Sequence, residues 1–358
     1  TAARLDRLEA ALASTAAAQV LLLVPESDDA PYLPLRALHA LLAGPSRAQA
    51  RLWFATRGAQ AVGAGTRVSV AQAALWGSAR VLAEEHPDLW GGLVDLDPGV
   101  DITQAAALLA EHLVAGDGED QVALRGLYRF VPRMVAVDRR KRTAPVAWRP
   151  DAAYLITGGL GDIGLKISRT LVLQGVRRLV LVGRTALPPR ERWSQLDAGS
   201  VAGQRAAAVR ALEALGASVH LAAVDVGDEA QLGGFLDAYR AAAWPAIRGV
   251  IHAAGSFDNQ LASTMTRSRF DAVLAPKLRG AQLLDRLLPD LDVFVLFSST
   301  GGFLAQAGQA NYAAANAGLD ALALDRHARG LPGLSIAWGV WADTGLVRNA
   351  AGQRNVAE

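Results

Sequence analysis

Residues 153–164 read AYLITGGLGDIG, in which an apolar run enters a turn that contains four glycines. The residues that follow, IGLKISRTLVLQG (163–175), have the apolar spacing of an amphipathic helix. A buried strand that passes through a glycine-rich turn into a helix is the first unit of a parallel α/β sheet. Further apolar runs, at 177–184, 218–226, 248–255, 293–299 and 334–341, predict the other strands of this sheet.

The spacing of the glycines predicts a binding site for a dinucleotide. Glycine lets the backbone approach a pyrophosphate closely, and the N-terminus of the following helix attracts its negative charge. A glycine pattern alone is weak in a chain with 35 glycines, but this one stands between a predicted strand and a predicted helix. A plain structural turn is the alternative. The expected cofactor loop consists of Gly158, Gly159, Leu160, Gly161, Asp162, Ile163 and Gly164.

The end of the second strand of this half indicates which dinucleotide is bound. A site for NADH usually has an acidic side chain there, which binds the ribose hydroxyls. This chain has Arg184 and Thr185 instead. A guanidinium and a hydroxyl suit the 2′-phosphate of NADPH, because both can donate charge-assisted hydrogen bonds to it. We therefore expect NADPH, and an exposed arginine without this role is the alternative.

The first half of the chain repeats the alternation of strands and helices without the glycine turn. Apolar runs at 19–25, 51–57, 91–97 and 120–126 predict strands, and the stretches 32–42, 70–86 and 102–114 predict helices. The first strand is followed by VPESDDAPYLP, which offers no cradle for a phosphate. The predicted fold class is α/β, with two Rossmann-like subdomains whose parallel sheets are flanked by helices. The N-terminal subdomain (1–150) is expected to be degenerate and structural, and the second (151–358) to be catalytic.

Length and composition restrict the class of protein. A chain of 358 residues is long enough for two hydrophobic cores. Its formal net charge of +2 gives no electrostatic reason to expect nucleic acid or a membrane as a partner. Cysteine is absent, which excludes disulfides and thiolate-bound metals and agrees with a cytoplasmic protein. No apolar stretch reaches the roughly 20 residues of a membrane-spanning helix, and we expect no metal site.

Residues with catalytic potential lie at 298–316, which read SSTGGFLAQAGQANYAAAN. Ser299 ends an apolar strand, and Tyr312 and Asn316 are one helical turn apart on an alanine-rich helix. A hydroxyl and a phenol held close together can polarise a carbonyl group and protonate its oxygen. Short-chain dehydrogenases usually have lysine four residues after this tyrosine, where this chain has Asn316.

Lys277 is the candidate for the missing lysine. Lysine occurs only at positions 141, 166 and 277, and the first two occupy ordinary solvated positions. Lys277 lies on a predicted helix that would pack beside the strand at 293–299. An ammonium group near Tyr312 would favour the phenolate and lower the pKa of the phenol from its ordinary value of about 10. Asn316 could then orient Lys277 or a water molecule.

Together, these four residues resemble the active site of the ketoreductase domains of modular polyketide synthases: Lys277, Ser299, Tyr312 and Asn316. These domains belong to the short-chain dehydrogenase/reductase superfamily. In them the positions of lysine and asparagine are exchanged relative to ordinary short-chain dehydrogenases. The resemblance covers nearly the whole chain, because the first half is similar to the family's non-catalytic structural subdomain. It implies NADPH-dependent reduction of a 3-ketoacyl thioester carried on an acyl carrier protein. Neighbouring synthase domains are the other expected partners.

The resemblance also implies further contacts with the cofactor. Lys277 is expected to hold the nicotinamide ribose, and His252 is expected to be packed rather than catalytic. A substrate lid is expected to begin within 338–346, and residues 345–358 stop where a lid helix should continue. Both ends of the chain resemble cut ends of a longer polypeptide. The remaining expected contacts with the cofactor are Tyr312 and, by part of the cofactor, Asp225 and Val226 for the adenine, Ala253, Ala254 and Gly255 for the nicotinamide ribose, and Val340 for the carboxamide.

Two segments carry the side chains that the resemblance connects with product stereochemistry. B-type ketoreductases give the 3R alcohol and have Leu-Asp-Asp at the positions of 257–259, where this chain has Phe-Asp-Asn. They also have Pro-x-x-x-Asn at the positions of 307–311, where this chain has alanine in place of the proline. A-type enzymes have tryptophan at 304, where this chain has leucine. The missing tryptophan and the presence of Asn311 favour B-type, although the triplet and the proline differ. The expected stereocontrol residues are Phe257, Asp258, Asn259, Leu304, Ala307, Gln309 and Asn311.

Two other functions stay open on the sequence alone. One is a redox-silent or epimerising ketoreductase-like scaffold domain in a megasynthase. Loss of Tyr312, Ser299 or the glycine turn would favour it, and all three are present. The other is a free-standing short-chain dehydrogenase, for which a Tyr-x-x-x-Lys pair and a lone domain would be the signs.

Overall fold

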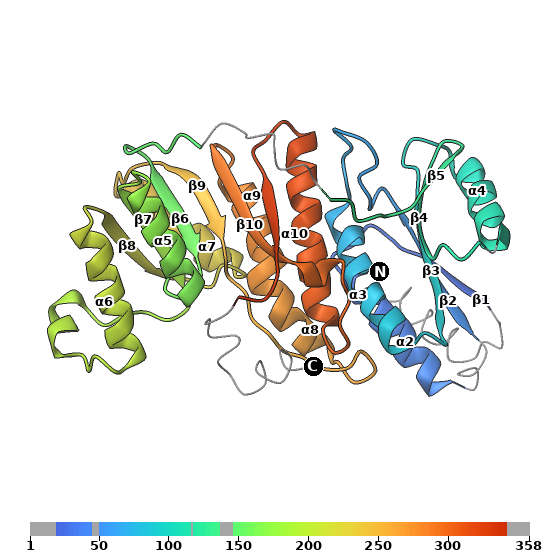
Figure 1. Cartoon of the computed structure of the whole chain (residues 1–358), viewed down its shortest axis with the longest axis horizontal. Helices are drawn as coiled ribbons and strands as arrows, with labels where there is room; N and C mark the ends of the chain where they lie inside the picture. The colour runs from blue at the N-terminus through green and yellow to red at the C-terminus, as the bar shows by residue number, and fades with distance from the viewer. Residues whose placement is uncertain (1–18, 45–49, 116, 137–145, 342–358) are drawn as a thin grey trace. The chain divides into compact units, whose positions relative to one another are not determined.

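The computed structural model describes residues 19–44, 50–115, 117–136 and 146–341 (Figure 1). The chain forms two compact units, each with its own contacts. The first consists of Thr1–Lys141, Phe257–Leu274 and Ser298–Leu331, and the second of Arg142–Ser256, Ala275–Phe297 and Pro332–Glu358. Two segments from the second half of the sequence therefore belong to the first unit. The expected lid at 345–358 lies outside the described residues.

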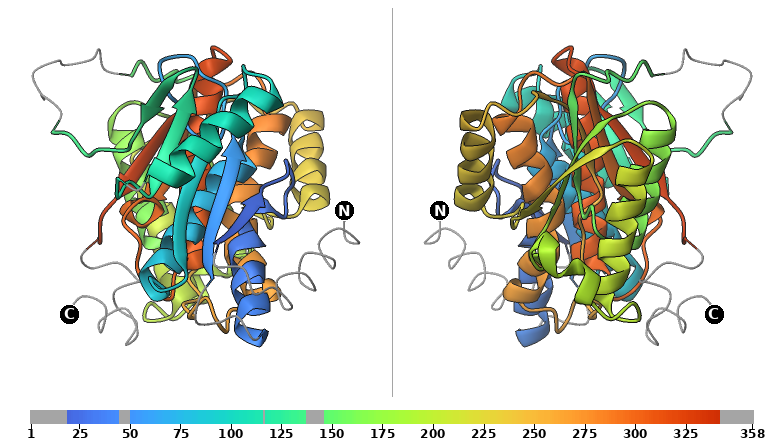
Figure 2. Two further views of the ribbon diagram at one scale, coloured as in Figure 1. Left: turned by 90° about the vertical axis from the view of Figure 1, so that its right-hand side faces the viewer. Right: turned by 90° about the vertical axis from the view of Figure 1, so that its left-hand side faces the viewer.

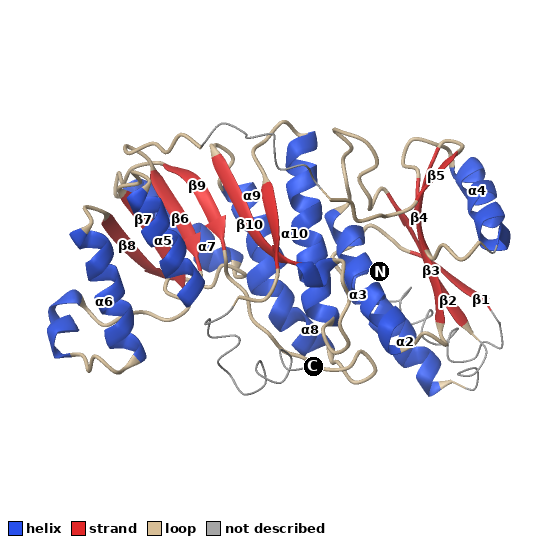
Figure 3. Cartoon of the chain, viewed as in Figure 1, coloured by secondary structure: helices blue, strands red, loops and turns tan. Residues whose placement is uncertain are grey.

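The first unit contains a five-stranded sheet with the order β1-β2-β3-β4-β5 (Figure 3). Strands β1 to β4 are parallel, as the alternation of strands and helices predicts. β5, a strand that was not predicted from the sequence, is antiparallel to β4. Only two residues separate these strands, and so short a connection joins antiparallel strands only. The strands are β1 (Gln19–Leu23), β2 (Arg51–Arg57), β3 (Trp90–Leu96), β4 (Gln121–Arg125) and β5 (Tyr128–Phe130).

Helices cover both faces of this first sheet. Successive side chains of β2 point to opposite faces of the sheet and belong to two hydrophobic cores. Leu52 and Phe54 pack with α2 and α3, whereas Ala55 packs with α4. α3 begins where the side chain of Ser69 accepts a hydrogen bond from the amide of Gln72, which satisfies one of the free N–H groups of the helix start. The elements are η1 (Ala30–Tyr32), α2 (Leu33–Ala43), α3 (Val70–Glu85) and α4 (Ile102–Ala115).

Two further helices of the first unit come from the second half of the sequence, α8 (Arg267–Leu274) and α10 (Ala310–Ala328), with η4 (Thr300–Gly302) before α10. α10 packs along α3 (Figure 1). Gly77 makes this close approach possible, because a Cβ atom there would lie 2.3 Å from the carbonyl oxygen of Ala313. Glycine inside a helix costs about 1 kcal/mol of stability relative to alanine, and the close packing offsets this cost.

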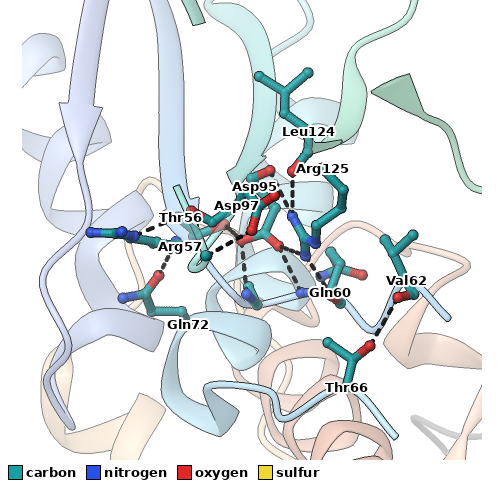
Figure 4. A network of polar contacts seen from close by, with 12 residues as sticks. Thr56, Arg57, Gln60, Val62, Thr66, Gln72, Asp95, Asp97, Leu124 and Arg125 are labelled. Carbon is teal, nitrogen blue, oxygen red and sulfur yellow. Dashed lines mark hydrogen bonds and ion pairs between the residues drawn. The ribbon is translucent and has the colours of Figure 1, made fainter. Parts of the chain in front are cut away.

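Polar groups fill the carboxyl ends of the strands in the first sheet (Figure 4). Asp95, at the end of β3, is fully buried and forms an ion pair with Arg125 in which Nη2 and Oδ2 are 2.5 Å apart. Its carboxylate also accepts hydrogen bonds from the amides of Ala59 and Gln60 and from the hydroxyl of Thr56. Loss of one partner of such a buried pair costs about 3–5 kcal/mol. Nucleotides bind α/β sheets at this edge, and here the protein's own side chains occupy it.

The second unit contains a six-stranded sheet with the order β11-β10-β9-β6-β7-β8. Strands β6 to β10 pair in parallel. The chain starts at β6 in the middle, winds out to β8 and returns to β9 beside β6. Dinucleotide-binding sheets have this doubly wound order, and they bind ligands where the direction of winding reverses. The predicted α/β fold with two Rossmann-like sheets is confirmed. The strands are β6 (Ala153–Thr157), β7 (Arg178–Gly183), β8 (Ser218–Ala223), β9 (Ile247–His252), β10 (Val293–Ser299) and β11 (Leu334–Trp338).

Helices lie on both faces of this second sheet. Figure 2 shows α5 (Asp162–Leu173) and α6 (Val201–Ala214) on one face, and α7 (Glu229–Ala241) and α9 (Gly280–Leu287) on the other. Because both faces are covered, the strands are apolar almost throughout, and all five residues of β6 are buried. The short helical segments η2 (Arg190–Gln195) and η3 (Ala275–Arg279) complete this unit.

The described ranges contain neither a membrane-spanning helix nor a cluster of metal-binding side chains. None of the helices there is both long enough and apolar enough to cross a membrane. In those same ranges no group of three or more histidine, cysteine, aspartate or glutamate side chains is placed to hold a metal ion.

Candidate active site

The glycine-rich turn forms a backbone cradle at the start of α5. Gly158 has a φ of 65°, in the left-handed region that favours glycine. Gly161 is the N-cap residue of α5 and has no side chain that could cap the N–H groups there. A Cβ atom at Gly164 would lie 2.3 Å from the carbonyl oxygen of Gly158. The turn thus folds only without side chains at these positions, and the helix start offers N–H donors to an anionic group. Gly159, Leu160, Asp162 and Ile163 complete it.

His252 joins the carboxyl ends of β6 and β9. Its Nε2 lies 2.7 Å from the carbonyl oxygen of Lys277, and its Nδ1 lies 2.8 Å from the hydroxyl of Thr157. Because a carbonyl only accepts, Nε2 carries the proton and Nδ1 accepts from Thr157. Burial lowers the pKa of His252 to about 4, so its ring is neutral at pH 7. The expectation of a packed histidine is confirmed by its complete burial.

The buried neutral His252 makes stability depend on pH. The unfolded chain binds a proton at His252 below its ordinary pKa of 6.5, whereas the folded chain binds it only below about 4. The free energy of unfolding therefore falls as the pH falls through this window. We expect His252→Gln to be less stable than the parent at pH 7, and to lose about 2 kcal/mol less than the parent between pH 7 and pH 5. Urea unfolding of both chains measures this, and an equal loss in both would contradict it.

Lys277 lies in η3, a π-helical segment, and its side chain is buried. Such segments occur frequently at functional sites. The ammonium of Lys277 donates a hydrogen bond of 3.0 Å to the carbonyl oxygen of Phe297 on β10. A Cβ atom on Gly255 would lie 3.7 Å from Nζ, so the ammonium is beside the turn that follows β9. As predicted, Lys277 is on a helical segment that reaches β10.

The other positions expected at the cofactor follow strands of the second sheet. The side chain of Arg184 is exposed, whereas the carboxylate of Asp225 accepts a hydrogen bond of 2.9 Å from the amide of Gly227. Because the carboxyl ends of parallel strands lie at one edge, the positions after β7, β8 and β9 share the edge of the glycine turn. The positions are Arg184 and Thr185 after β7, Asp225 and Val226 after β8, Ala253, Ala254 and Gly255 after β9, and the exposed Val340 after β11.

Ser299, Tyr312 and Asn316 come together within the first unit. Ser299 ends β10, and Tyr312 lies in the first turn of α10. A Cβ atom on Gly301 would lie 3.6 Å both from Oγ of Ser299 and from the ring of Tyr312. The buried Asn316 donates from Nδ2 to the carbonyl oxygen of Tyr312 at 2.8 Å. The side chains of Ser299 and Asn316 both act to lower the pKa of the phenol.

Burial raises the pKa of Tyr312 above its ordinary value, and the hydrogen bonds with Ser299 and Asn316 offset this only in part. The direction is opposite to the lowering that the sequence led us to expect. The physical reason is that the phenolate loses more by leaving water than two neutral hydrogen bonds return. Tyr312 therefore stays protonated at neutral pH and has a proton to donate.

The candidate catalytic residues are divided between the two units. Ser299, Tyr312 and Asn316 belong to the first, and Lys277 belongs to the second together with the glycine turn. β10 contributes residues to both units, since its first five residues belong to the second and Ser299 belongs to the first.

The segments expected to control stereochemistry lie beside Tyr312 in the first unit. The ring of Phe257 packs on the ring of Tyr312, with 4.1 Å between the ring centroids. Asp258 forms an ion pair with Arg269, so its carboxylate is not free. The seven expected stereocontrol residues differ in their exposure to solvent. Four are exposed, one is half-buried and two are buried: Phe257, Asn259, Leu304 and Ala307 are exposed, Asp258 is half-buried, and Gln309 and Asn311 are buried.

Asn311 connects one of these segments with the helix of the catalytic tyrosine candidate. Its Nδ2 donates to the carbonyl oxygen of Asp258 at 2.9 Å, and its Oδ1 accepts from the amide of Tyr312 at 2.7 Å. Because Asn311 is completely buried, it acts on the site through these two bonds and not by touching a substrate. The sequence motif singles out Asn311, but it does not show that the side chain points inward and bonds to the backbone of Asp258 and Tyr312.

Sequence reasoning missed the residues of α3 that hold this region. Gly77 allows α10 to approach, and Arg80 donates from Nη1 to the carbonyl oxygen of Gly302 at 2.9 Å. A glycine inside a helical pattern is a sequence signal for such a contact. Arg80 gives no comparable signal, because exposure to solvent is the ordinary expectation for an arginine.

Comparison with known proteins identifies the family. Residues 152–343 match the family model of the KR domain. Residues 1–134 match the Rossmann fold domain of the polyketide synthase extender module SpnB. The chain therefore belongs to the ketoreductase domains of modular polyketide synthases, and it is an oxidoreductase by family. The resemblance drawn from Lys277, Ser299, Tyr312 and Asn316 is confirmed at the level of the family.

Solved structures and curated proteins give the degree of similarity. PlmKR1, the ketoreductase from the first module of phoslactomycin biosynthesis in Streptomyces sp. HK803, is 36% identical with a TM-score of 0.79, over 96% of this chain and 75% of that chain. A structure of an A1-type ketoreductase is 37% identical with a TM-score of 0.74, over 90% of this chain and 65% of that chain. The 5-methyl-1-naphthoate synthase of Streptomyces sahachiroi is 41% identical over 303 residues, which are 84% of this chain and 17% of that protein. The chain thus spans a small part of the length of such curated relatives.

Proposed function

We propose that this ketoreductase reduces a 3-ketoacyl thioester on an acyl carrier protein to the 3-hydroxyacyl thioester, with NADPH as the hydride donor. The observation that carries the proposal is that Ser299, Tyr312 and Asn316 lie together at the start of α10, with a phenol that keeps its proton. In this proposal residues 151–358 form the catalytic subdomain and residues 1–150 the structural one. The protein acts in the cytoplasm beside neighbouring synthase domains.

The second unit has groups that fit a dinucleotide phosphate. The N-cap residue of α5 is a glycine without a capping side chain, and Gly158 and Gly164 keep the turn narrow enough for its N–H groups to converge on an anion. Lys277 would hold the ribose hydroxyls through an ammonium that is already buried at the same edge. Arg184 and Thr185 would hold the 2′-phosphate. NADPH, when bound, supplies a hydride to the carbonyl carbon.

The residues of the first unit serve the ketone oxygen, on which negative charge develops as hydride arrives. The hydroxyls of Ser299 and Tyr312 would donate hydrogen bonds to that oxygen. Tyr312 then gives its proton to the oxygen, so that the ketone gains one hydride on carbon and one proton on oxygen and becomes an alcohol. Ser299 and Asn316, which both act to lower the pKa of the phenol, would stabilise the phenolate that is left.

The preference for NADPH depends on Arg184 in this proposal. We expect Arg184→Ala to raise KM for NADPH by about 10- to 100-fold, because a hydrogen bond to a charged group contributes about 1.5–3 kcal/mol, and to leave KM for NADH nearly unchanged. Arg192→Ala removes the same charge from the exposed segment eight residues further on and serves as the control. Steady-state kinetics with both cofactors measure this. Equal effects of the two substitutions would rule out a specific phosphate contact.

The product is proposed to be the 3R alcohol of B-type ketoreductases. The absence of tryptophan at Leu304 and the presence of Asn311 support this assignment. The experiment that tests the proposed function is chiral analysis of the alcohol formed from a 3-keto-2-methylacyl thioester with NADPH. We expect one 3R product, whereas a 3S product would overturn the B-type assignment and leave the reductase function standing.

A further inference from the structure

Glu85 joins two loops that are far apart in the sequence. It is the last residue of α3, and both of its carboxylate oxygens accept hydrogen bonds from backbone amides. Oε2 lies 2.7 Å from the amide nitrogen of Ala262, and Oε1 lies 2.7 Å from the amide nitrogen of Gly308. Hydrogen bonds to an ionised acceptor are roughly twice as strong as neutral ones. One side chain therefore holds the backbones of two loops, one with each of its acceptor atoms.

The two loops, 257–262 and 303–308, are also bonded to each other. The amide of Gln260 donates to the carbonyl oxygen of Gly308 at 2.8 Å. Gly308 has a φ of 82°, a backbone conformation that favours glycine. On the other side, Nε2 of His39 on α2 donates to the carbonyl oxygen of Ala262 at 2.8 Å. The loop backbones are thus anchored from two helices of the structural half of the sequence.

These loops carry the exposed side chains that were expected to control stereochemistry. The first begins with Phe257, whose ring packs on Tyr312, and the second carries Leu304 and Ala307. A substrate beside the phenol meets these side chains, so their spacing limits how the ketone can lie. Because Glu85 is bonded to both backbones, its carboxylate determines that spacing without needing to contact the substrate.

We propose that Glu85 is a positioning residue for stereocontrol, which holds the loops 257–262 and 303–308 at one spacing and thereby determines which face of the ketone is reduced. This role rests on the proposed function of the site. It gives the structural half of the chain a part in product stereochemistry. A carboxylate is required there because two N–H donors converge on it from different loops.

The test compares three variants of the whole chain. Glu85→Gln keeps the size of the side chain but replaces one acceptor with an amide NH2, which cannot accept from the second loop. Glu85→Ala removes both acceptors, and Glu84→Gln makes the same chemical change at the exposed neighbouring position as a control. Each variant reduces a racemic 3-keto-2-methylacyl thioester with NADPH. The ratio of the diastereomeric alcohols, the KM for the thioester and the Kd for NADPH are measured.

We expect the parent and Glu84→Gln to give the same ratio of diastereomeric alcohols. Glu85→Gln should lower this ratio at least about 5-fold and raise KM for the thioester, while Kd for NADPH stays constant. A residue that only supports the fold would change unfolding but not this ratio. An unchanged ratio in Glu85→Gln, with circular dichroism like that of the parent, overturns the role of Glu85. A parent that reduces no thioester refutes the proposed function itself, which separates the two failures.

Discussion

Replacing Tyr312 with phenylalanine is expected to lower kcat for ketone reduction by about 10³-fold or more and to leave the Kd for NADPH nearly unchanged. The substitution removes only the phenolic hydroxyl, and with it the proton donor and one hydrogen bond to the ketone oxygen. In other enzymes a proton donor raises the rate by about 10²–10⁴-fold, and one hydrogen bond to the developing oxyanion raises it by about 10²–10³-fold. The phenyl ring still packs on Phe257, so the shape of the site is kept. Consumption of NADPH with a 3-ketoacyl thioester as substrate measures the effect.

A second tyrosine provides the control for this result. Tyr239 is also largely buried, and its hydroxyl donates to the carbonyl oxygen of Pro245 at 2.9 Å in the second unit. Tyr239→Phe makes the same chemical change and should leave kcat close to that of the parent. Full turnover in Tyr312→Phe would exclude the phenol as proton donor, and equal losses in both variants would show general damage to the protein.

The substitution Gly164→Ala is expected to weaken NADPH binding by about 100-fold or more. The added methyl group would lie 2.3 Å from the carbonyl oxygen of Gly158, a distance that no relaxed contact allows. Because the clash involves backbone, the turn itself must shift, and the N–H groups at the start of α5 would no longer converge on the pyrophosphate. Fluorescence titration of the chain with NADPH measures the Kd directly.

Gly233→Ala is the matched control for the glycine turn. Gly233 lies in α7 of the same unit, and nothing is within 4 Å of the position that its Cβ would take. Alanine is a better helix former than glycine by about 1 kcal/mol, so this variant should be as stable as the parent or more stable and bind NADPH equally well. If Gly164→Ala also binds NADPH like the parent, the turn does not hold the pyrophosphate.

Much of the fold could be predicted because burial leaves a periodic pattern in the sequence. β6, β7 and β9 are mostly apolar because helices cover both faces of their sheet, and the glycine turn marks the end of β6 and the start of α5. The hairpin strand β5 was missed because its three residues, Tyr128–Phe130, are all exposed and show no alternation. The assignment of 257–274 and 298–331 to the first unit was missed as well, because packing between distant segments leaves no local pattern.

The candidate site was predicted as a set of residues but not as a set of interactions. Lys277 could be found because only three lysines exist in the chain. The raised pKa of Tyr312 could not, because burial of a side chain depends on residues that are remote in the sequence. Glu85 shows the same limit more clearly. It ends an ordinary helix, and only the folded chain reveals that two loops, more than 170 residues away in sequence, donate to its carboxylate.

The central proposal is that this chain transfers hydride from NADPH to a 3-ketoacyl thioester. The direct measurement is an incubation of the purified chain with NADPH and a 3-ketoacyl thioester, in which NADPH oxidation and the 3-hydroxyacyl product are quantified together. We expect oxidation of NADPH in a one-to-one ratio with formation of the alcohol, and a far slower reaction with NADH. A folded chain that binds NADPH but forms no alcohol would contradict this proposal and favour a redox-silent scaffold domain.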